Sequence, residues 1–428
     1  MRISRSHGLA AVGVAGLLAL SACGSSGGSA GTSASGGAAA GGGGGGGGSV
    51  NYGVLSCFTG RLASLGQAML QGSEVAQKAI NDAGGVMGKK VSLSHADTSC
   101  DLADAVPATQ SLLSKGVAGI IGPETQEIAA VEPILKNSHI VDEFQGGDTA
   151  RDHQTDPFLF RDSPSDSQLG VAMALYAHQK GYKTAALLFY SDVAAQTFAA
   201  PIKAAFEKLG GKIIKNVVVA PGQTSYLPQV QDIAGAKPDV IFTQSDAPTA
   251  AVLFREFQQT NNDAIPVVGT DVTGGSDYLK AIGYGVAHAH LVSVYGASVT
   301  GQGADAFAKG FTALHPGQQP LANANYAYDA VITLALADEF SKSTDGSKAA
   351  KNMVQVTNPP GTACYDYAAC LKLLQAGTKI NYEGASGSLD YNKYNNVFGP
   401  YGAYVSDASG TEQQVGTLTA EALAAATP

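Results

Sequence analysis

Four cysteines in the body of this chain have the number and spacing that disulfide chemistry requires. Cys57 and Cys100 each follow a predicted strand, and Cys364 lies shortly before Cys370. In an exported chain an even number of cysteines indicates two disulfides, with three possible pairings. A metal site is the alternative, but there is no Cys-x-x-Cys motif, and we interpret His288 and His290 as a surface pair on a strand. The sequence predicts disulfides and no metal.

No arrangement of residues typical of covalent or phosphoryl-transfer catalysis is present. The chain has no Gly-x-Ser-x-Gly, Ser-x-x-Lys or His-Glu-x-x-His motif. The run from Gly84 to Lys90 resembles a phosphate loop only in part, because its spacing is short and no Ser or Thr follows the lysine. Asp271, directly after a predicted buried strand, is a candidate for ligand binding rather than for catalysis. We therefore predict a protein that is not an enzyme and holds no cofactor.

The first 23 residues have the organisation of a bacterial secretory signal. Arg2 and Arg5 precede an apolar stretch from Gly8 to Leu20, which is shorter than the roughly 20 residues of a permanent membrane helix. It ends in Leu20-Ser21-Ala22-Cys23, which resembles the lipobox of bacterial lipoproteins, in which the cysteine receives a diacylglycerol. Ordinary secretion is the alternative. Residues 24–49 contain only Gly, Ser, Ala and one Thr, a composition that predicts a disordered tether.

The remaining chain has the composition of a globular protein. Hydrophobic residues make up 45% of the 428 residues and charged residues 14%, which provides a core for two or three compact units. Lys and Arg total 26 against 35 Asp and Glu, a formal net charge of −9. This balance argues against a protein that binds nucleic acid through phosphate contacts.

From Val50 onwards, short apolar runs alternate with amphipathic stretches. Strands are predicted at Tyr52–Ser56, Lys90–His95, Val117–Ile121, His139–Asp142, Thr184–Tyr190, Ile213–Val219, Val240–Thr243 and Pro266–Gly269. Helices are predicted between them, including one at Ala195–Leu209. Such alternation is typical of parallel sheets with right-handed crossovers, so we predict an α/β fold with two doubly wound parallel-sheet lobes. Gly387–Tyr391 and Tyr401–Val405 are predicted to pair as a closing hairpin.

The loops at the carboxyl ends of these strands are the predicted ligand site. An open parallel sheet binds its ligand in the crevice at that edge. The predicted loops are Ser56–Leu65, Thr98–Asp101, Gly122–Gln126 and Glu143–Asp148 in the first lobe, and Tyr190–Asp192, Gln244–Asp246 and Thr270–Gly274 in the second.

Several motifs, in their order along the chain, resemble the type I periplasmic binding proteins, and specifically the leucine-binding or branched-chain amino acid branch that serves ABC importers. They are Thr59-Gly60 after the first strand, Ile120-Ile-Gly-Pro123, Phe160-Arg161 and Asn381-Tyr-Glu-Gly-Ala-Ser-Gly387. The resemblance implies two lobes joined by a three-strand hinge, with crossings near 160–164, 292–296 and 386–389. We therefore predict a first lobe of residues 50–160 plus 297–386 and a second of 161–296 plus 387–428.

The resemblance also implies that an amino-acid ligand is held between the lobes. Carried over by position, the candidate ligand-binding residues are Thr59, Glu124, Thr125, Gln145, Asp148, Tyr190, Gln244 and Asp271. Glu124 departs from the family, in which a small hydroxyl residue often follows Gly-Pro. A buried, unpaired Glu124 facing a ligand carboxylate would cost several kcal/mol. This departure indicates a ligand other than a plain branched-chain amino acid.

The sequence and the resemblance together predict a solute-binding protein of an ABC importer. It would be a monomer, anchored by lipid on the extracytoplasmic face of the cell membrane. It would capture a small polar solute, such as an amino acid or a related amide or acid, and deliver it to a permease. No nucleic-acid partner is expected. A ligand-binding sensor of a signalling system is the alternative hypothesis.

Overall fold

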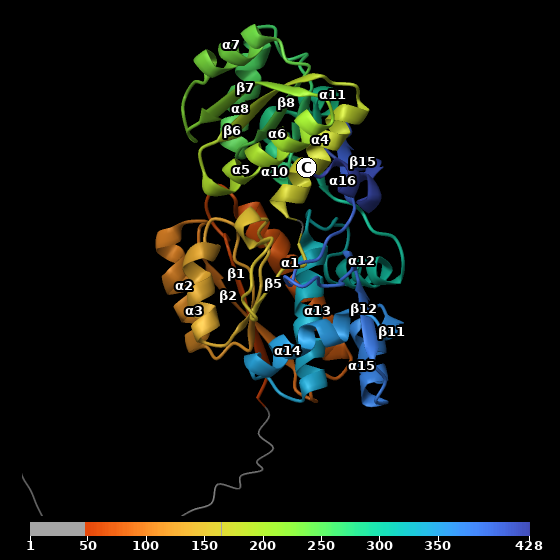
Figure 1. The fold of residues 1–428 in the computed structure, drawn as a ribbon. Helices are drawn as coiled ribbons and strands as arrows, with labels where there is room; N and C mark the ends of the chain where they lie inside the picture. The colour runs from red at the N-terminus through yellow and green to blue at the C-terminus, as the bar shows by residue number, and fades with distance from the viewer. Residues whose placement is uncertain (1–47, 164) are drawn as a thin grey trace, which may run out of the picture. The chain divides into compact units, whose positions relative to one another are not determined.

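The structure is a computed structural model that describes residues 48–163 and 165–428 (Figure 1). The predicted signal peptide, Cys23 and the tether up to residue 47 lie outside the described residues. Within the described part of the chain, no helix combines the length and apolarity needed to cross a membrane.

The first sheet has five strands in the order β2-β1-β3-β4-β5, and all of its neighbouring strands are parallel. Its strands are β1 (Val50–Ser56), β2 (Val91–Asp97), β3 (Gly119–Ile121), β4 (Val141–Glu143) and β5 (Leu159–Phe160). The chain places β2 on one side of β1 and then β3, β4 and β5 on the other side. A switch point therefore lies between β1 and β3.

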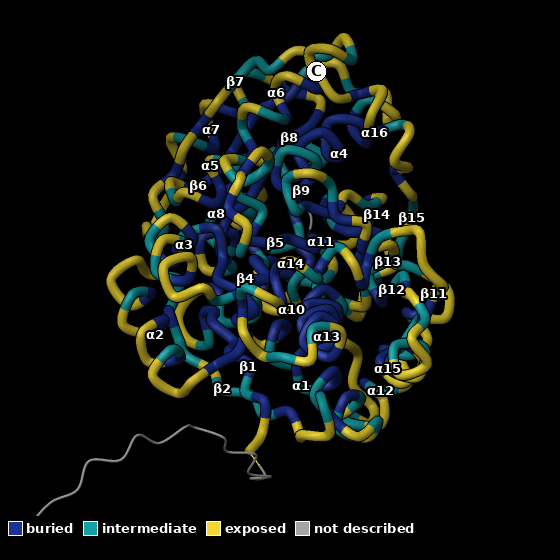
Figure 2. Tube along the Cα trace, turned by 60° about the horizontal axis from the view of Figure 1, so that its bottom comes forward, coloured by how far each residue is buried: buried dark blue, intermediate teal, exposed yellow. Residues whose placement is uncertain are grey.

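Helices cover both faces of this sheet because successive side chains of each strand point to opposite faces. Ile121 packs in one core with α1 and α13, whereas the neighbouring Ile120 packs in a second core with α2 and α3. The α13 helix is buried along almost its whole length (Figure 2). The helices of this lobe are α1 (Ala63–Asp82), α2 (Leu102–Ser114), α3 (Ile128–Asn137), α12 (Gln302–Leu314), α13 (Ala324–Ser341), α14 (Gly346–Thr357) and α15 (Tyr367–Gln375).

The second sheet has seven strands in the order β15-β14-β10-β9-β8-β6-β7. The strands β6 (Thr184–Tyr190), β7 (Lys212–Val219), β8 (Val240–Gln244), β9 (Val267–Gly269) and β10 (Leu291–Gly296) are parallel. They repeat the connectivity of the first sheet, with a switch point between β6 and β8. The prediction of two doubly wound α/β lobes is therefore confirmed.

One continuous core supports the second lobe, and it reaches from α4 to the end of the chain. Its helices are α4 (Asp166–Gln179), α5 (Val193–Thr197), α6 (Ala199–Lys208), α7 (Leu227–Ala236), α8 (Ala247–Gln259), α9 (Asp271–Gly274), α10 (Ser276–Ile282), α11 (Tyr284–His290) and α16 (Ala420–Ala426). The single helix predicted at 195–209 is in fact α5 followed by α6. Pro201 explains the break, because it has no N–H with which to continue the hydrogen bonds of α5.

The predicted closing hairpin is wrong in its first strand. The strand β14 (Tyr401–Ser406) pairs with β10 and with β15 (Glu412–Leu418), and not with residues 387–391. A local turn closes this pair, since the Asp407 carboxylate accepts hydrogen bonds from the backbone N–H groups of Ser409 and Thr411 at 2.8 and 3.0 Å. His288 and His290 lie at the end of the helix α11 rather than on a strand, so that prediction is wrong as well.

A small third sheet joins β11 (Thr362–Cys364), β12 (Ile380–Gly384) and β13 (Gly387–Ser388) at the edge of the first lobe. The carboxylate of Asp329 on α13 holds the turn between β12 and β13. It accepts hydrogen bonds from the Tyr382 hydroxyl at 2.6 Å and from the backbone N–H groups of Ala385 and Ser386 at 2.9 and 2.7 Å. Leu389, which follows this turn, is buried in the core of the first lobe.

The chain therefore leaves the first lobe later than the sequence analysis expected. Tyr391 and Val397 pack in the first core, whereas Tyr401 packs in the second. This differs from the predicted lobe boundary at 386/387, and the reason is that the apolar side chains of 389–397 are buried against the first sheet.

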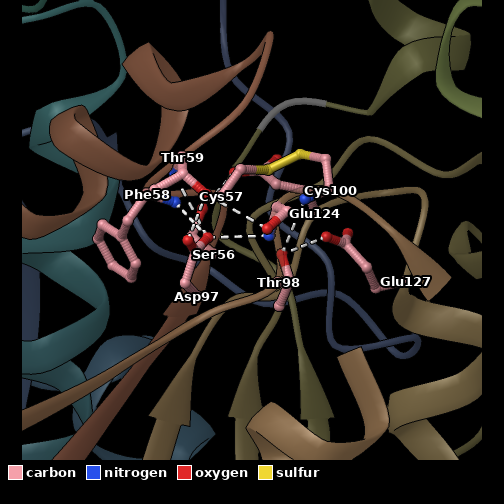
Figure 3. Close-up of a disulfide and its surroundings, with 10 residues drawn as sticks. Ser56, Cys57, Phe58, Thr59, Asp97, Thr98, Cys100, Glu124 and Glu127 are labelled. Atoms are coloured by element: carbon pink, nitrogen blue, oxygen red, sulfur yellow. Dashed lines mark hydrogen bonds between the residues drawn. A yellow bond between two sulfur atoms is a disulfide. The ribbon is translucent and has the colours of Figure 1, made fainter. Parts of the chain in front are cut away.

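Two disulfides are present, Cys57–Cys100 and Cys364–Cys370. The first joins the loops that follow β1 and β2, and Figure 3 shows it next to Ser56, Thr98 and Glu124. The second joins β11 to α15. The sequence left three pairings open, and the structure has this one, with the paired Cα atoms 5.0 and 5.3 Å apart.

Removing the Cys57–Cys100 bridge should destabilise the protein more than removing the other bridge. The two bridges span 43 and 6 residues, and the chain-entropy relation gives about 4 and about 2 kcal/mol for loops of these lengths. Urea denaturation of Cys57→Ala/Cys100→Ala and of Cys364→Ala/Cys370→Ala measures the two losses. An equal or larger loss in the second variant would contradict the expectation.

Candidate ligand-binding site

A small cavity lies where the carboxyl ends of both sheets meet. Its volume, counted as the space open to the centre of a water molecule, is about 90 Å³. Residues of both lobes line it. From the first lobe come Leu62, Leu65, Ala68, Met69, Glu124, Thr125, Gln126, Gln145, Gly146, Gly147, Ala322, Asn323 and Ala327, and from the second Asp166, Leu169, Ala194, Phe198, Gln244, Asp271, Val272, Tyr295 and Gly296. Ser163, in the segment between the lobes, completes the lining.

Glu124 reaches the cavity because β3 ends at Ile121 and the chain turns at Gly122. Gly122 has φ +102°, and a Cβ there would collide with the carbonyl oxygen of Leu55 in β1, so only glycine fits. Glu124 is 9% exposed, and its Oε1 accepts a hydrogen bond of 3.3 Å from the Ser56 hydroxyl (Figure 3). Burial raises the pKa of Glu124 well above its usual value, and Glu127 and Asp271 raise it further.

Asp166 is the first residue of α4, and its carboxylate faces the cavity from the second lobe. Its Oδ2 accepts a hydrogen bond of 2.6 Å from the Thr197 hydroxyl. Burial raises the pKa of Asp166 to about 8, and the neighbouring carboxylate of Asp271 adds to the shift.

Asp271 begins α9 and joins the two lobes across the cavity. Its Oδ2 accepts a hydrogen bond of 2.8 Å from the side-chain amide of Asn323, which directly precedes α13. Burial raises the pKa of Asp271, and the bond from Asn323 opposes that shift.

The predicted residues Glu124, Thr125, Gln145, Gln244 and Asp271 all line the cavity. Gln244 is 4% exposed, and its Oε1 accepts a hydrogen bond of 2.7 Å from the Thr270 hydroxyl. The Nε2 of Gln145 donates to Asp162 at 3.0 Å. These bonds fix the two amides at the ends of β8 and β4.

Thr59, Asp148 and Tyr190 are not among the lining residues. The Thr59 hydroxyl donates to the Asp97 carboxylate at 2.5 Å and so ties together the loops after β1 and β2. Asp148 caps a short 3₁₀ helix, Thr149–Arg151, by accepting from the Ala150 N–H at 3.0 Å. The buried Tyr190 ring lies under the Arg61 guanidinium, 5.8 Å from its centroid.

Arg61 makes a second contact between the lobes. It comes from the loop after β1 and forms an ion pair with Asp246, which caps the helix α8 of the second lobe. The Arg61 side chain is 47% exposed, whereas Asp246 is 1% exposed. This ion pair closes the cleft outside the cavity and involves no lining residue.

Asp166, Tyr295 and Asn323 line the cavity but were not among the predicted site residues. Asp166 follows β5, a strand of two residues that is too short to give a sequence signal. Tyr295 lies at the carboxyl end of β10, so extending the strand-end rule to that strand would have found it. Asn323 precedes a helix, and only the three-dimensional fold brings it to the site.

The variant Asp166→Asn should reduce the pH dependence of stability. Because the pKa of Asp166 is raised to about 8 in the folded protein, the stability that its protonated form contributes is full below about pH 4 and is lost as the pH rises toward 8, at up to about 1.4 kcal/mol per pH unit. Urea denaturation between about pH 5 and 8 measures this slope. Asp104→Asn, on the exposed start of α2, is the control, and a variant slope equal to the wild-type slope would refute the role of Asp166.

A protein family and several known proteins are similar to this chain in sequence. The sequence profile of a family described as "Periplasmic binding protein" matches residues 49–367. A Leu/Ile/Val-binding protein homolog 3 from Brucella melitensis is 26% identical over 235 residues, which cover 54% of this chain and 63% of that protein. A Leu/Ile/Val-binding protein homolog 1 from Brucella abortus is 25% identical over 300 residues, which cover 69% of this chain and 79% of that protein.

Solved structures share the fold. The leucine-binding protein LivK from Thermotoga maritima superposes with a TM-score of 0.75 at 19% identity, covering 87% of this chain and 99% of that one. A solute-binding protein from R. palustris in complex with benzoate gives a TM-score of 0.72 at 18% identity, covering 89% of this chain and 97% of that one. Since the family profile spans most of the chain, this protein belongs to the periplasmic binding protein family.

Proposed function

We propose that this protein is the extracytoplasmic, lipid-anchored solute-binding component of an ABC importer. It captures a small polar solute between its lobes and delivers that solute to a permease. The observation that carries the proposal is the cavity at the carboxyl ends of both sheets, lined by apolar side chains and a few convergent polar groups. Such a lining is typical of small-molecule sites, in which a few polar groups in a mostly apolar pocket orient the ligand.

The comparisons support an amino acid or a chemically related solute. Two of the similar proteins are named as Leu/Ile/Val-binding proteins or their homologues, and one structural neighbour was solved in complex with isoleucine. The contacts between the lobes, Arg61 with Asp246 and Asn323 with Asp271, support binding by closure around the solute.

Asp271→Ala should weaken solute binding more than tenfold, because Asp271 both lines the cavity and bonds to the opposite lobe. A thermal-shift screen of leucine, isoleucine, valine, amides, short acids and sugars first identifies the solute. A ligand at about 100 times its Kd adds about 2.7 kcal/mol of stability. Calorimetric titration then compares wild type, Asp271→Ala and the surface control Asp104→Asn. Equal affinity in wild type and Asp271→Ala would remove Asp271 from the site.

Cys23→Ala should release the protein from the membrane into the medium, because the variant has no thiol to accept the lipid. Cell fractionation with immunoblotting measures the distribution. Ser29→Ala, a few residues further along the predicted tether, is the control that should stay with the membrane. Membrane retention of Cys23→Ala would refute the lipid anchor but not solute binding.

A further inference from the structure

The cavity is lined by acidic groups without a basic counterpart. Carboxyl groups come from the loop after β3 (Glu124), from the start of α4 (Asp166) and from the start of α9 (Asp271), and no Lys, Arg or His among the described residues lines the cavity. The carboxylate of Asp271 raises the pKa of both Glu124 and Asp166, and Asp166 also raises the pKa of Glu124. The site therefore concentrates potential negative charge in one small cavity.

The carboxyl groups are only partly satisfied by the protein. Asp166 and Asp271 each receive a side-chain hydrogen bond from a neutral donor, Thr197 and Asn323 respectively. Glu124, which is 9% exposed, receives one long bond at Oε1, and within the described part of the chain no hydrogen bond reaches its Oε2. A buried carboxylate with few donors is costly to ionise, so these groups gain from a ligand that brings positive charge.

Arg61 and Arg161, which lie close to lining residues in the sequence, are occupied by other partners. Arg61 forms its ion pair with Asp246. Arg161 forms an ion pair with Asp152 and donates to the backbone carbonyl of Asp148 at 3.1 Å. A ligand carboxylate would therefore meet three carboxyl groups and no basic side chain in the cavity lining.

We infer that the solute is an organic cation, an amine with an apolar body and no carboxylate. This inference rests on the proposed function and deepens it by naming the class of ligand. The protonated amine would lie among the three carboxyl groups and receive charge-assisted hydrogen bonds. The apolar body would pack against the aliphatic and aromatic lining, Leu62, Leu65, Leu169, Phe198 and Val272.

A zwitterionic amino acid is the competing ligand, and the fold shows where its carboxylate would go. The helices α1 and α13 both begin at the cavity, with no side-chain cap and no acidic residue in the first turn. N–H groups of their first turns could donate hydrogen bonds to a carboxylate. The test must therefore separate an amine from the amino acid that differs from it only by the carboxylate.

Matched pairs make that separation. 3-Methylbutylamine is leucine without its carboxylate, and 2-phenylethylamine is phenylalanine without it. Calorimetric titration of the full protein with both pairs should give at least tenfold tighter binding for the amine of one pair. Glu124→Gln should reduce this preference by about tenfold, which is about 1.4 kcal/mol. Asp104→Asn should leave the preference unchanged, and the thermal unfolding of each variant checks that it folds.

Each outcome decides the inference. Tighter binding of leucine or phenylalanine than of the matching amine overturns it, yet still supports the proposed function. The absence of binding by both amines also overturns it. In that case the broader screen of acids, amides and sugars tests the proposed function separately. An amine preference that survives Glu124→Gln unchanged would remove Glu124 from the cation site.

Discussion

The direction of the strands is the constraint on which the rest of this structure depends. In each lobe five parallel strands follow the same connectivity, so all of their carboxyl ends lie at one edge. Crossover helices must then begin at that edge, and loops leave it in opposite directions at the switch points. Glu124 lies in such a loop next to β1, and Gln244 lies at the equivalent point in the second sheet. The cavity is a consequence of placing these two edges against each other.

Buried charge is the second consequence of that arrangement. The cavity brings carboxyl groups of both lobes out of water, and burial is the first cause of the raised pKa values of Glu124, Asp166 and Asp271. The protein offsets this cost only in part, through hydrogen bonds to the three carboxyl groups and through the charge of Arg161 near Asp166. A site of this kind is stable while empty because its carboxyl groups can take up protons, and it favours a ligand that lets them ionise.

The sequence was a good guide wherever local pattern decides structure. The strand Thr184–Tyr190 has the predicted bounds, and loops at strand ends supplied Glu124, Gln244 and Asp271 to the cavity. The sequence was a poor guide where distant packing decides. Residues 389–397 form almost no regular structure, and only burial against the first sheet assigns them to it. Asp166 and Asn323 also reach the site through distant packing, since Asp166 follows the two-residue strand β5 and Asn323 lies between two helices.

The two disulfides differ in how exposed their cysteine residues are. Cys364 and Cys370 are 2% and 0% exposed, whereas Cys100 is only partly buried although Cys57 is 0% exposed. Thiol–disulfide exchange requires a thiolate to approach one sulfur in line with the bond. A small-molecule reductant therefore has a partly exposed cysteine to approach at Cys100, whereas both cysteines of the Cys364–Cys370 bridge are buried in the intact fold. Mild reduction would thus act first on the loops that carry the solute site and last on the distant corner of the lobe.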